Sequence, residues 1–497
     1  MMTIDQLISA FIVKSIEIGD LDPIDSVYTT NKLLNLLGLE VYQPEVIDHL
    51  AESRLDILDA LVEFAVASNK IDDLGASRDI LGSEIMDLIT PNPSEINQTF
   101  WEKHEENPKK ATDYFFEMSK RNNYIKTREI AKNIAFTHES DYGKLEITIN
   151  LSKPEKDPRE IALAAKAKKS TNYPSNFLVV ENEGFKGNLT HPGRSNHRII
   201  RMDLAGDPWG FQYSPYAYYN EHSIFLAIQH RPMDVGAQAI RNLLEITSQF
   251  PHYFVGSNAG LPIVGGSILS HDHYQGGRYD FPIQEADYSH HFTLKDQTDV
   301  EAGILEWPMS VIRLRSENRQ AIAKAADQIM TAWKDYSDES VGVYAYTADE
   351  PHNAVTPIAR RDGAIYELDI VLRNNRTSEE FPDGVFHPHP RVHHIKKENI
   401  GLIEVMGLAV LPARLKTELA VVEQYLLGEV DTVADLHQEW ANKLKAENPR
   451  IQADQVQEIV EQAVGAVFQE VLEDAGVFKR DRKGQEAFIR FIHTLTE

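Results

Sequence analysis

Two histidine triplets, each of which closes a similar run of predicted strands and helices, constrain the fold of this chain most. The first triplet is His271-Asp272-His273, and the second is His387-Pro388-His389. Apolar residues alternate in the predicted strands and recur at helical spacing in one helix of each run. Because the two runs are alike, we expect two comparable halves of mixed α and β structure. The predicted strands lie at 177–180, 199–202 and 223–228 before the first triplet and at 309–314, 341–346 and 365–372 before the second, with helices from 234 and at 322–333.

The regions outside the two halves are predicted to be helical. Apolar residues recur at helical spacing at 58–65 and again at 456–467. From Gly143 the pattern changes to the alternation of a half-buried strand. The predicted regions are a mainly helical one at 1–120, a first half at 121–300, a second half at 301–420 and a helical one at 421–497.

The composition excludes several classes of function. The sequence contains no cysteine, which excludes disulfides, thiolate nucleophiles and cysteine-based zinc sites. A formal net charge of −26 repels nucleic acid and anionic membranes, so an anionic ligand must be held by a local cluster of donors. No apolar run reaches the roughly 20 residues that span a bilayer, and the first 20 residues resemble a helix rather than a signal peptide. We therefore expect a cytoplasmic protein that binds neither nucleic acid nor membranes.

The first triplet suits nucleophilic chemistry on a phosphate. Alternate residues of a strand face the same side, so His271, His273 and Gln275 would line one surface. A neutral imidazole is a good nucleophile near pH 7, and the glycine-rich stretch at 260–266 lets backbone approach an anion closely. Gln275 can donate to a phosphoryl oxygen without competing for protons. A single His-x-His is more often part of an ordinary strand, and the second triplet strengthens the chemical interpretation.

Beyond these features, the sequence resembles the galactose-1-phosphate uridylyltransferases, in particular the type 2 branch of Gram-positive bacteria. The resemblance runs from about residue 110 to about residue 420. Its most specific segments are His-Asp-His-Tyr-Gln-Gly-Gly from His271, His-His-Ile-Lys-Lys-Glu-Asn-Ile-Gly-Leu-Ile-Glu from His393, and Glu221-His222-Ser223 leading to His230. The resemblance implies an α+β fold of two histidine-triad-like halves, each with an antiparallel sheet, plus helical N-terminal and C-terminal extensions.

The resemblance also implies a nucleotidyltransferase of galactose metabolism. Such an enzyme moves UMP from UDP-glucose to galactose 1-phosphate through a covalent uridylyl-histidine, and glucose 1-phosphate leaves. The nucleophile corresponds to His273. Gln275 stands where related hydrolases of the histidine-triad type have a third histidine, and a glutamine offers water less acid–base help. Transfer is therefore expected to be favoured over hydrolysis.

The zinc site of the family is incomplete in this sequence. His271 and His230 correspond to zinc ligands in some members, but the Cys-x-x-Cys pair of those members aligns with Asn176 and Val179. Valine cannot ligate zinc, and an asparagine amide is a poor ligand. We therefore expect no zinc there, and we expect the two histidines to act as hydrogen-bonded supports.

The second triplet is the remaining metal candidate. His387 and His389 match a histidine pair that binds a structural iron or zinc in some relatives. The neighbouring His393 and His394 leave that alignment ambiguous by a few residues, and a His-x-His is also a common accidental pattern. We expect no required cofactor, and a weakly held structural iron or zinc is left open at this pair.

Further polar residues are implied to bind the substrates, UDP-glucose and galactose 1-phosphate. Some align with family contacts, and others lie in the glycine-rich approach to the first triplet. The quaternary state is open, with a homodimer as one expectation. The candidates are Asn182, Asn258, Ser267, Lys153 and Lys156 for the nucleotide and its phosphates, and Lys396, Lys397 and Glu404 for the hexose phosphate.

Three other functions stay open at the level of sequence. Dinucleoside-polyphosphate phosphorylases and adenylyltransferases share the histidine-triad architecture and a His-x-His-x-Gln element. A metal-dependent hydrolase would use the His-x-His residues as ligands. A nucleotide-binding protein without catalytic activity is the third alternative.

Overall fold

One antiparallel sheet forms the centre of the protein, in a computed structural model that describes residues 2–47, 51–153, 159, 173–266 and 268–496. Among these residues the sheet has ten strands, in the order β3-β4-β5-β7-β6-β13-β14-β10-β9-β8. The strands are β3 (Ile200–Leu204), β4 (Asp207–Tyr213), β5 (Ser223–Ala227), β6 (Phe254–Gly256), β7 (His273–Gly277), β8 (Tyr288–Phe292), β9 (Glu301–Leu305), β10 (Val311–Ser316), β13 (Asn353–Asp362) and β14 (Ile365–Asn374).

The sheet consists of two five-stranded halves with the same connectivity. In each half three strands pair in chain order, a helix follows, and the fifth strand inserts between the third and the fourth. The helix is α9 (Ala237–Gln249) in the first half and α10 (Arg319–Lys334) in the second. The halves join edge to edge where β6 pairs with β13, with Gly256 opposite Ile358. The predicted α+β fold with two antiparallel halves is therefore confirmed, and the two halves share one continuous sheet.

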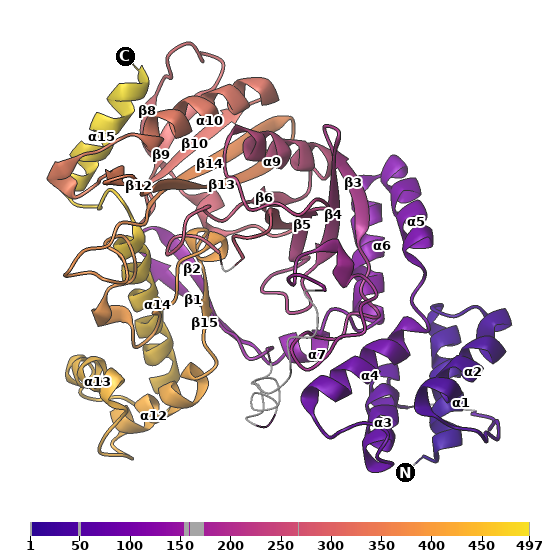
Figure 1. The fold of residues 1–497 in the computed structure, drawn as a ribbon. Coiled ribbons are helices and arrows are strands. Elements are labelled where there is room, and N and C mark those ends of the chain that lie inside the picture. Colours follow the sequence, from indigo (N-terminus) through magenta and orange to yellow (C-terminus); the bar gives the residue numbers. More distant parts are fainter. Residues whose placement is uncertain (1, 48–50, 154–158, 160–172, 267, 497) are drawn as a thin grey trace.

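Helices cover one face of this sheet along both halves (Figure 1). Helices α9 and α10 lie on it, because their apolar stripes pack against the alternate strand residues that point the same way. Three further helices extend the same core: α5 (Pro93–Glu106), α6 (Pro108–Arg121) and α15 (Arg482–Thr496).

The opposite face of the second half is covered by a small sheet. This sheet pairs β1 (Ile134–Ser140) with β2 (Gly143–Ile149), and β15 (Leu408–Leu411) runs parallel to β2. Its apolar residues share a core with β10, β13 and β14. The segment before β15 also reaches the uncovered face of the first half, where its residues line a pocket together with those of β7. The helices beside it are α11 (Leu402–Val405), α12 (Leu415–Leu427), α13 (Asp435–Glu447) and α14 (Val456–Ala475).

The N-terminal helices form a separate core beside the sheet (Figure 1). Within the described parts of the chain, none of the helices has the length and apolarity that crossing a bilayer would require. The region boundaries at 120, 300 and 420 stay a prediction. The helices of the N-terminal core are α1 (Ile4–Ile18), α2 (Ser26–Leu37), α3 (Arg54–Ala67) and α4 (Gly75–Asp87). The short helix α7 (Thr127–Ile130) comes later in the chain, after α6.

Two predicted strands are wrong. The segment at 177–180 leads into a 3-10 turn, η2 (Val180–Asn182), because the Asn182 amide donates to the carbonyls of Asn176 and Val179 and closes a loop. The segment at 341–346 begins with the last residue of the 3-10 turn η4 (Glu339–Val341), and only its last residue enters a strand, β11 (Tyr346–Thr347). The Asp338 side chain accepts from the backbone N–H and the hydroxyl of Ser340, so local side-chain hydrogen bonds outweigh the apolar patterns in both segments.

Candidate active site

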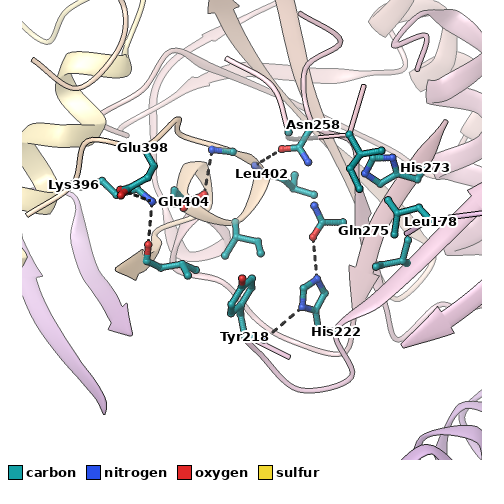
Figure 2. Close-up of a pocket in the computed structure, with 16 residues that line it drawn as sticks. Leu178, Tyr218, His222, Asn258, His273, Gln275, Lys396, Glu398, Leu402 and Glu404 are labelled. Carbon is teal, nitrogen blue, oxygen red and sulfur yellow. Dashed lines mark hydrogen bonds and ion pairs between the residues drawn. The ribbon is translucent and has the colours of Figure 1, made fainter. Parts of the chain in front are cut away.

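A pocket of about 480 Å³ lies between the first half of the sheet and the segment that returns from the second half (Figure 2). It brings His273, Gln275 and Asn258 from the first half together with Lys396 and Glu404 from the second. All five are sequence-predicted site residues, although they come from segments more than a hundred residues apart.

Strand β7 places the first two of these residues. His273 lies opposite Leu226 and Gln275 opposite Ile224 on β5, so the two polar side chains face the pocket together. Tyr274, between them, points to the helix-covered face, where it stacks on Trp209 with ring centroids 4.7 Å apart. The strand is thus held from the core side, and its other side is presented to the cavity.

His273 is neutral and has a defined tautomer. Its Nδ1 lies 2.8 Å from the backbone carbonyl oxygen of His271. A carbonyl only accepts hydrogen bonds, so Nδ1 carries the proton and Nε2 carries the lone pair. Burial lowers the pKa of the His273 imidazole to about 4. At neutral pH this residue therefore presents an unprotonated nitrogen.

His271 does not line the pocket that His273 and Gln275 face. Strand β7 begins only at His273, so the period-two rule does not extend back to His271. The His271 ring donates through Nε2 to the carbonyl oxygen of Ala227 at 2.9 Å. Its backbone carbonyl orients His273, so His271 contacts the site through its main chain.

The residues of the family zinc site form no metal cluster. His230 pairs through Nε2 with Oε1 of Glu181 at 2.9 Å, and its ring is edge-on to that of His271 with centroids 5.6 Å apart. Across the described residues there is no group of three or more His, Cys, Asp or Glu side chains arranged to hold a metal. Val179 offers no ligand to complete the site, and the Asn176 side chain accepts from the backbone N–H of Leu178.

Lys396 and Glu404 form the wall of the pocket that the second half contributes. The Lys396 ammonium lies 3.0 Å from Oε1 of Glu404 and also donates to the carbonyl oxygen of Val410. Oε2 of Glu404 accepts from the backbone N–H of Gly401 at 3.1 Å. The wall therefore carries a cation and an anion side by side.

Asn258 connects the two walls. Its Oδ1 accepts from the backbone N–H of Leu402 at 2.9 Å, which ties the start of α11 to the first half. Lys397, next to Lys396, is exposed and lies outside the pocket. The sequence pattern could not separate these two lysines, because their orientation depends on how the returning segment packs.

The remaining nucleotide candidates lie elsewhere. Asn182 is buried within its own loop, and its Oδ1 contacts Nε2 of His191 at 2.6 Å. Lys153 is exposed and does not line the pocket. Lys156 and Ser267 lie outside the described residues. The structure therefore brings Asn258, but neither Asn182 nor Lys153, to the cavity.

The second triplet lies in a loop after β14 rather than on a strand, because Pro388 and Pro390 lack the N–H groups that a central strand needs. The two ring nitrogens of His387 lie 3.2 Å from the Pro388 carbonyl and 3.2 Å from Oδ1 of Asn399. The His389 ring stacks on Phe381, with centroids 4.1 Å apart. Each imidazole has its own protein partners, and a metal at this pair stays a prediction.

Several lining residues had not been given a role from the sequence, and His222 is the most informative. Its Nε2 lies 2.9 Å from Oε1 of Gln275. The Glu221-His222-Ser223 segment had carried the family resemblance, but only the pairing of β5 with β7 shows which residue it serves. Tyr218 and Leu178 also line the cavity.

Both domains of one family match the chain. The family described as galactose-1-phosphate uridyl transferase matches with its N-terminal domain at residues 19–232 and with its C-terminal domain at residues 245–442. Together the two matches cover most of the chain, including every residue of the pocket.

Curated relatives match over almost their whole length. A galactose-1-phosphate uridylyltransferase of Streptococcus mutans is 53% identical, covering 98% of this chain and 99% of the relative. Proteins of the same name from Enterococcus faecalis and Pediococcus pentosaceus are 53% and 56% identical, covering 98% and 95% of this chain and 98% and 96% of the relatives. Among solved structures, a yeast Ap4A phosphorylase matches with a TM-score of 0.36 and 14% identity, over 69% of this chain and 93% of that one. That likeness is too weak to support an inference.

Proposed function

The chain belongs to the galactose-1-phosphate uridylyltransferase family, and from that premise we propose that it moves UMP from UDP-glucose to galactose 1-phosphate through a covalent intermediate on His273. His273 supports this role because its Nδ1 proton is committed to the His271 carbonyl while its ring lines the pocket. A neutral imidazole with a free Nε2 lone pair is the form that attacks phosphorus.

In the first half-reaction, Nε2 of His273 attacks the α-phosphorus of UDP-glucose. The N–P bond forms, the bond from the α-phosphorus to the bridging oxygen breaks, and glucose 1-phosphate leaves with that oxygen. The imidazole becomes positively charged, and its Nδ1–H keeps donating to the His271 carbonyl. In the second half-reaction a phosphate oxygen of galactose 1-phosphate attacks the same phosphorus, the N–P bond breaks, and UDP-galactose leaves.

The other pocket residues bind and orient the substrates in this proposal. Gln275 donates to a phosphoryl oxygen of the α-phosphate. Lys396 binds the hexose phosphate, and Glu404 accepts hydrogen bonds from sugar hydroxyls. The substrates are small molecules, and the steps assigned to His273 and Gln275 use no cofactor.

Intact-mass measurement after incubation with UDP-glucose alone tests this proposal. We expect the mass to rise by one UMP, and we expect the added mass to disappear when galactose 1-phosphate follows. The His273→Ala variant should take up no UMP, whereas His290→Ala, at an exposed histidine on β8, should behave as the wild type. An adduct that forms with a dinucleoside polyphosphate but not with UDP-glucose would contradict the proposal and favour a phosphorylase.

A further inference from the structure

His222 lies next to Gln275 on the wall of the pocket, at the residue before β5 begins (Figure 2). It is buried, with 4% of its surface exposed, and its Nε2 lies 2.9 Å from Oε1 of Gln275. On its other side, the backbone N–H of Tyr218 points to Nδ1 at 3.5 Å. A backbone N–H can only donate, so Nδ1 accepts and the ring proton resides on Nε2. His222 therefore donates to the amide oxygen of Gln275.

The surroundings of His222 favour this single form of the ring. Burial lowers the pKa of the His222 imidazole to about 4, so the ring is neutral at working pH. The Tyr219 ring stacks on it, with centroids 4.5 Å apart. The preceding residue, Glu221, has a φ of 54° and is fully buried, and its carboxylate binds the Tyr253 hydroxyl and the Arg278 guanidinium. These contacts hold the backbone from which His222 projects.

The hydrogen bond decides which end of the Gln275 amide faces the pocket. The oxygen and the nitrogen of a glutamine amide are interchangeable in shape, so packing alone does not select between the two orientations. With its oxygen bound to His222, the amide presents its nitrogen on the opposite side, as Figure 2 shows. A flipped amide would instead direct its oxygen at an anionic phosphoryl group and repel it.

We propose that His222 is a positioning residue for UMP transfer, which orients the Gln275 amide so that its N–H groups face the α-phosphate. This inference rests on the proposed function and adds a residue that does not itself contact the reacting atoms. If this is correct, removing the hydrogen-bond donor of His222 should lower the rate of UMP transfer only in a protein that still has Gln275.

A double-mutant cycle in the full-length protein tests this dependence. The measurement is the single-turnover rate of UMP transfer from UDP-glucose to the protein. We expect Gln275→Met to lower the rate about 100-fold, as removal of one oxyanion donor does. We expect His222→Leu to lower it about 10-fold, with the KM for UDP-glucose within about twofold of wild type. The double variant should match Gln275→Met within about twofold.

The His222→Gln variant restores a donor and should recover most of the lost rate, which a residue that only fills space would not achieve. The control is His290→Leu, the same replacement at an exposed histidine, and it should leave the rate unchanged. Thermal melting of each variant shows whether it is folded. If the losses of the two single variants multiply in the double variant, or if His222→Leu is as fast as the wild type, the inference is wrong.

Nitrogen NMR of protein labelled at histidine separates this inference from the proposed function. We expect a His222 signal of the Nε2–H form, assigned by its absence in His222→Gln, which shifts in Gln275→Met. A signal of the Nδ1–H form would overturn the inference whatever the activity. If UDP-glucose forms no adduct on the wild type while the Nε2–H signal is present, the proposed function fails and the His222–Gln275 contact stands.

Discussion

The two halves of the sheet share one connectivity, but the strands that occupy the same place in each half carry different polar groups. Those of the first half are neutral, and those of the second half are charged. In the first half, β7 presents His273 and Gln275 on the face away from the helices. In the second half, β14 presents Glu367 and Asp369 on that face, since Leu368 between them packs in the helix-covered core. One face opens into a pocket, and the other is buried.

The carboxylates of β14 are neutralised by arginines from the strands on either side. Arg313 on β10 lies 2.7 Å from Asp369, and Arg360 on β13 lies 2.5 Å from it. Burial alone would raise the pKa of Asp369, but the two guanidinium groups outweigh burial and hold that pKa below its usual value. Arg313 also donates to the carbonyl oxygen of Ile283, which lies beneath the small sheet.

Strand order therefore determines which side chains lie together, and the charge of those side chains determines whether they can bind a phosphate or only pack against each other. A pocket for an anionic phosphate cannot tolerate an unpaired carboxylate beside its nucleophile. On β7 the facing groups are a neutral imidazole and a neutral amide. On β14 the charges compensate one another, and the surface is used for packing.

Removing the nucleophile should have the largest effect. His273→Ala is expected to lower UMP transfer by at least about 10⁴-fold, because no neighbouring side chain can replace a group that becomes covalently modified. Steady-state rates and thermal melting should show this loss without a loss of folding. Activity within about tenfold of the wild type would end the assignment of His273.

Breaking the ion pairs of β14 should affect stability rather than chemistry. Asp369→Ala removes the fully buried carboxylate that Arg313 and Arg360 share and leaves Glu367 to pair with both, so it should lower the free energy of unfolding by about 3 to 5 kcal/mol. Urea unfolding measures this change. The control is Asp362→Ala, which removes an exposed carboxylate 3.0 Å from Arg315 and should change stability by less than about 1 kcal/mol. A folded Asp369→Ala protein with a large loss of turnover would show that the halves are chemically coupled.

Lowering the pH should reduce the stability that the buried histidines of the first half contribute before it breaks the ion pairs of the second half. His222 and His273 have pKa values of about 4 when folded and ordinary values near 6.5 when unfolded. Between these values the unfolded chain binds more protons, so stability is retained above pH 6.5 and falls as the pH drops toward 4. Each imidazole contributes a slope of about 1.4 kcal/mol per pH unit.

Urea unfolding at several pH values between 7 and 4.5 measures this slope, and UMP transfer from UDP-glucose should stay nearly constant down to about pH 5 while the protein is folded. A rate that falls with a midpoint near pH 6.5 would show that His273 has an ordinary pKa.

Chelation should have the smallest effect. Removing metal is expected to leave most of the UMP transfer activity, because the zinc site of the family lacks two ligands at Asn176 and Val179. If a stabilising metal is present, we predict it near His387 and His389, and its loss should lower the melting temperature more than turnover. Metal analysis and melting curves check both points. Stoichiometric zinc that is lost with activity in His271→Ala would show that another residue completes the site.

The site could be predicted from the sequence to the extent that it depends on local periodicity. His273 and Gln275 share a face because a strand repeats every two residues, and that relation holds wherever the strand pairs. His271 precedes that strand, because the point where a strand begins depends on its partners. The second triplet lies outside the sheet, because two prolines exclude that segment from it.

By itself, the sequence determined the reactive groups of this protein: a histidine and a glutamine at alternate positions, no cysteine, and two similar runs of elements. Only the tertiary structure decided that Lys396 and Glu404 of the second half line the same pocket as His273, and that His222 forms a hydrogen bond with Gln275. It also decided that burial lowers the pKa of His273. The physical reason is that pairing register, burial and side-chain contacts are set by residues distant in the chain, whereas periodicity and residue chemistry are local.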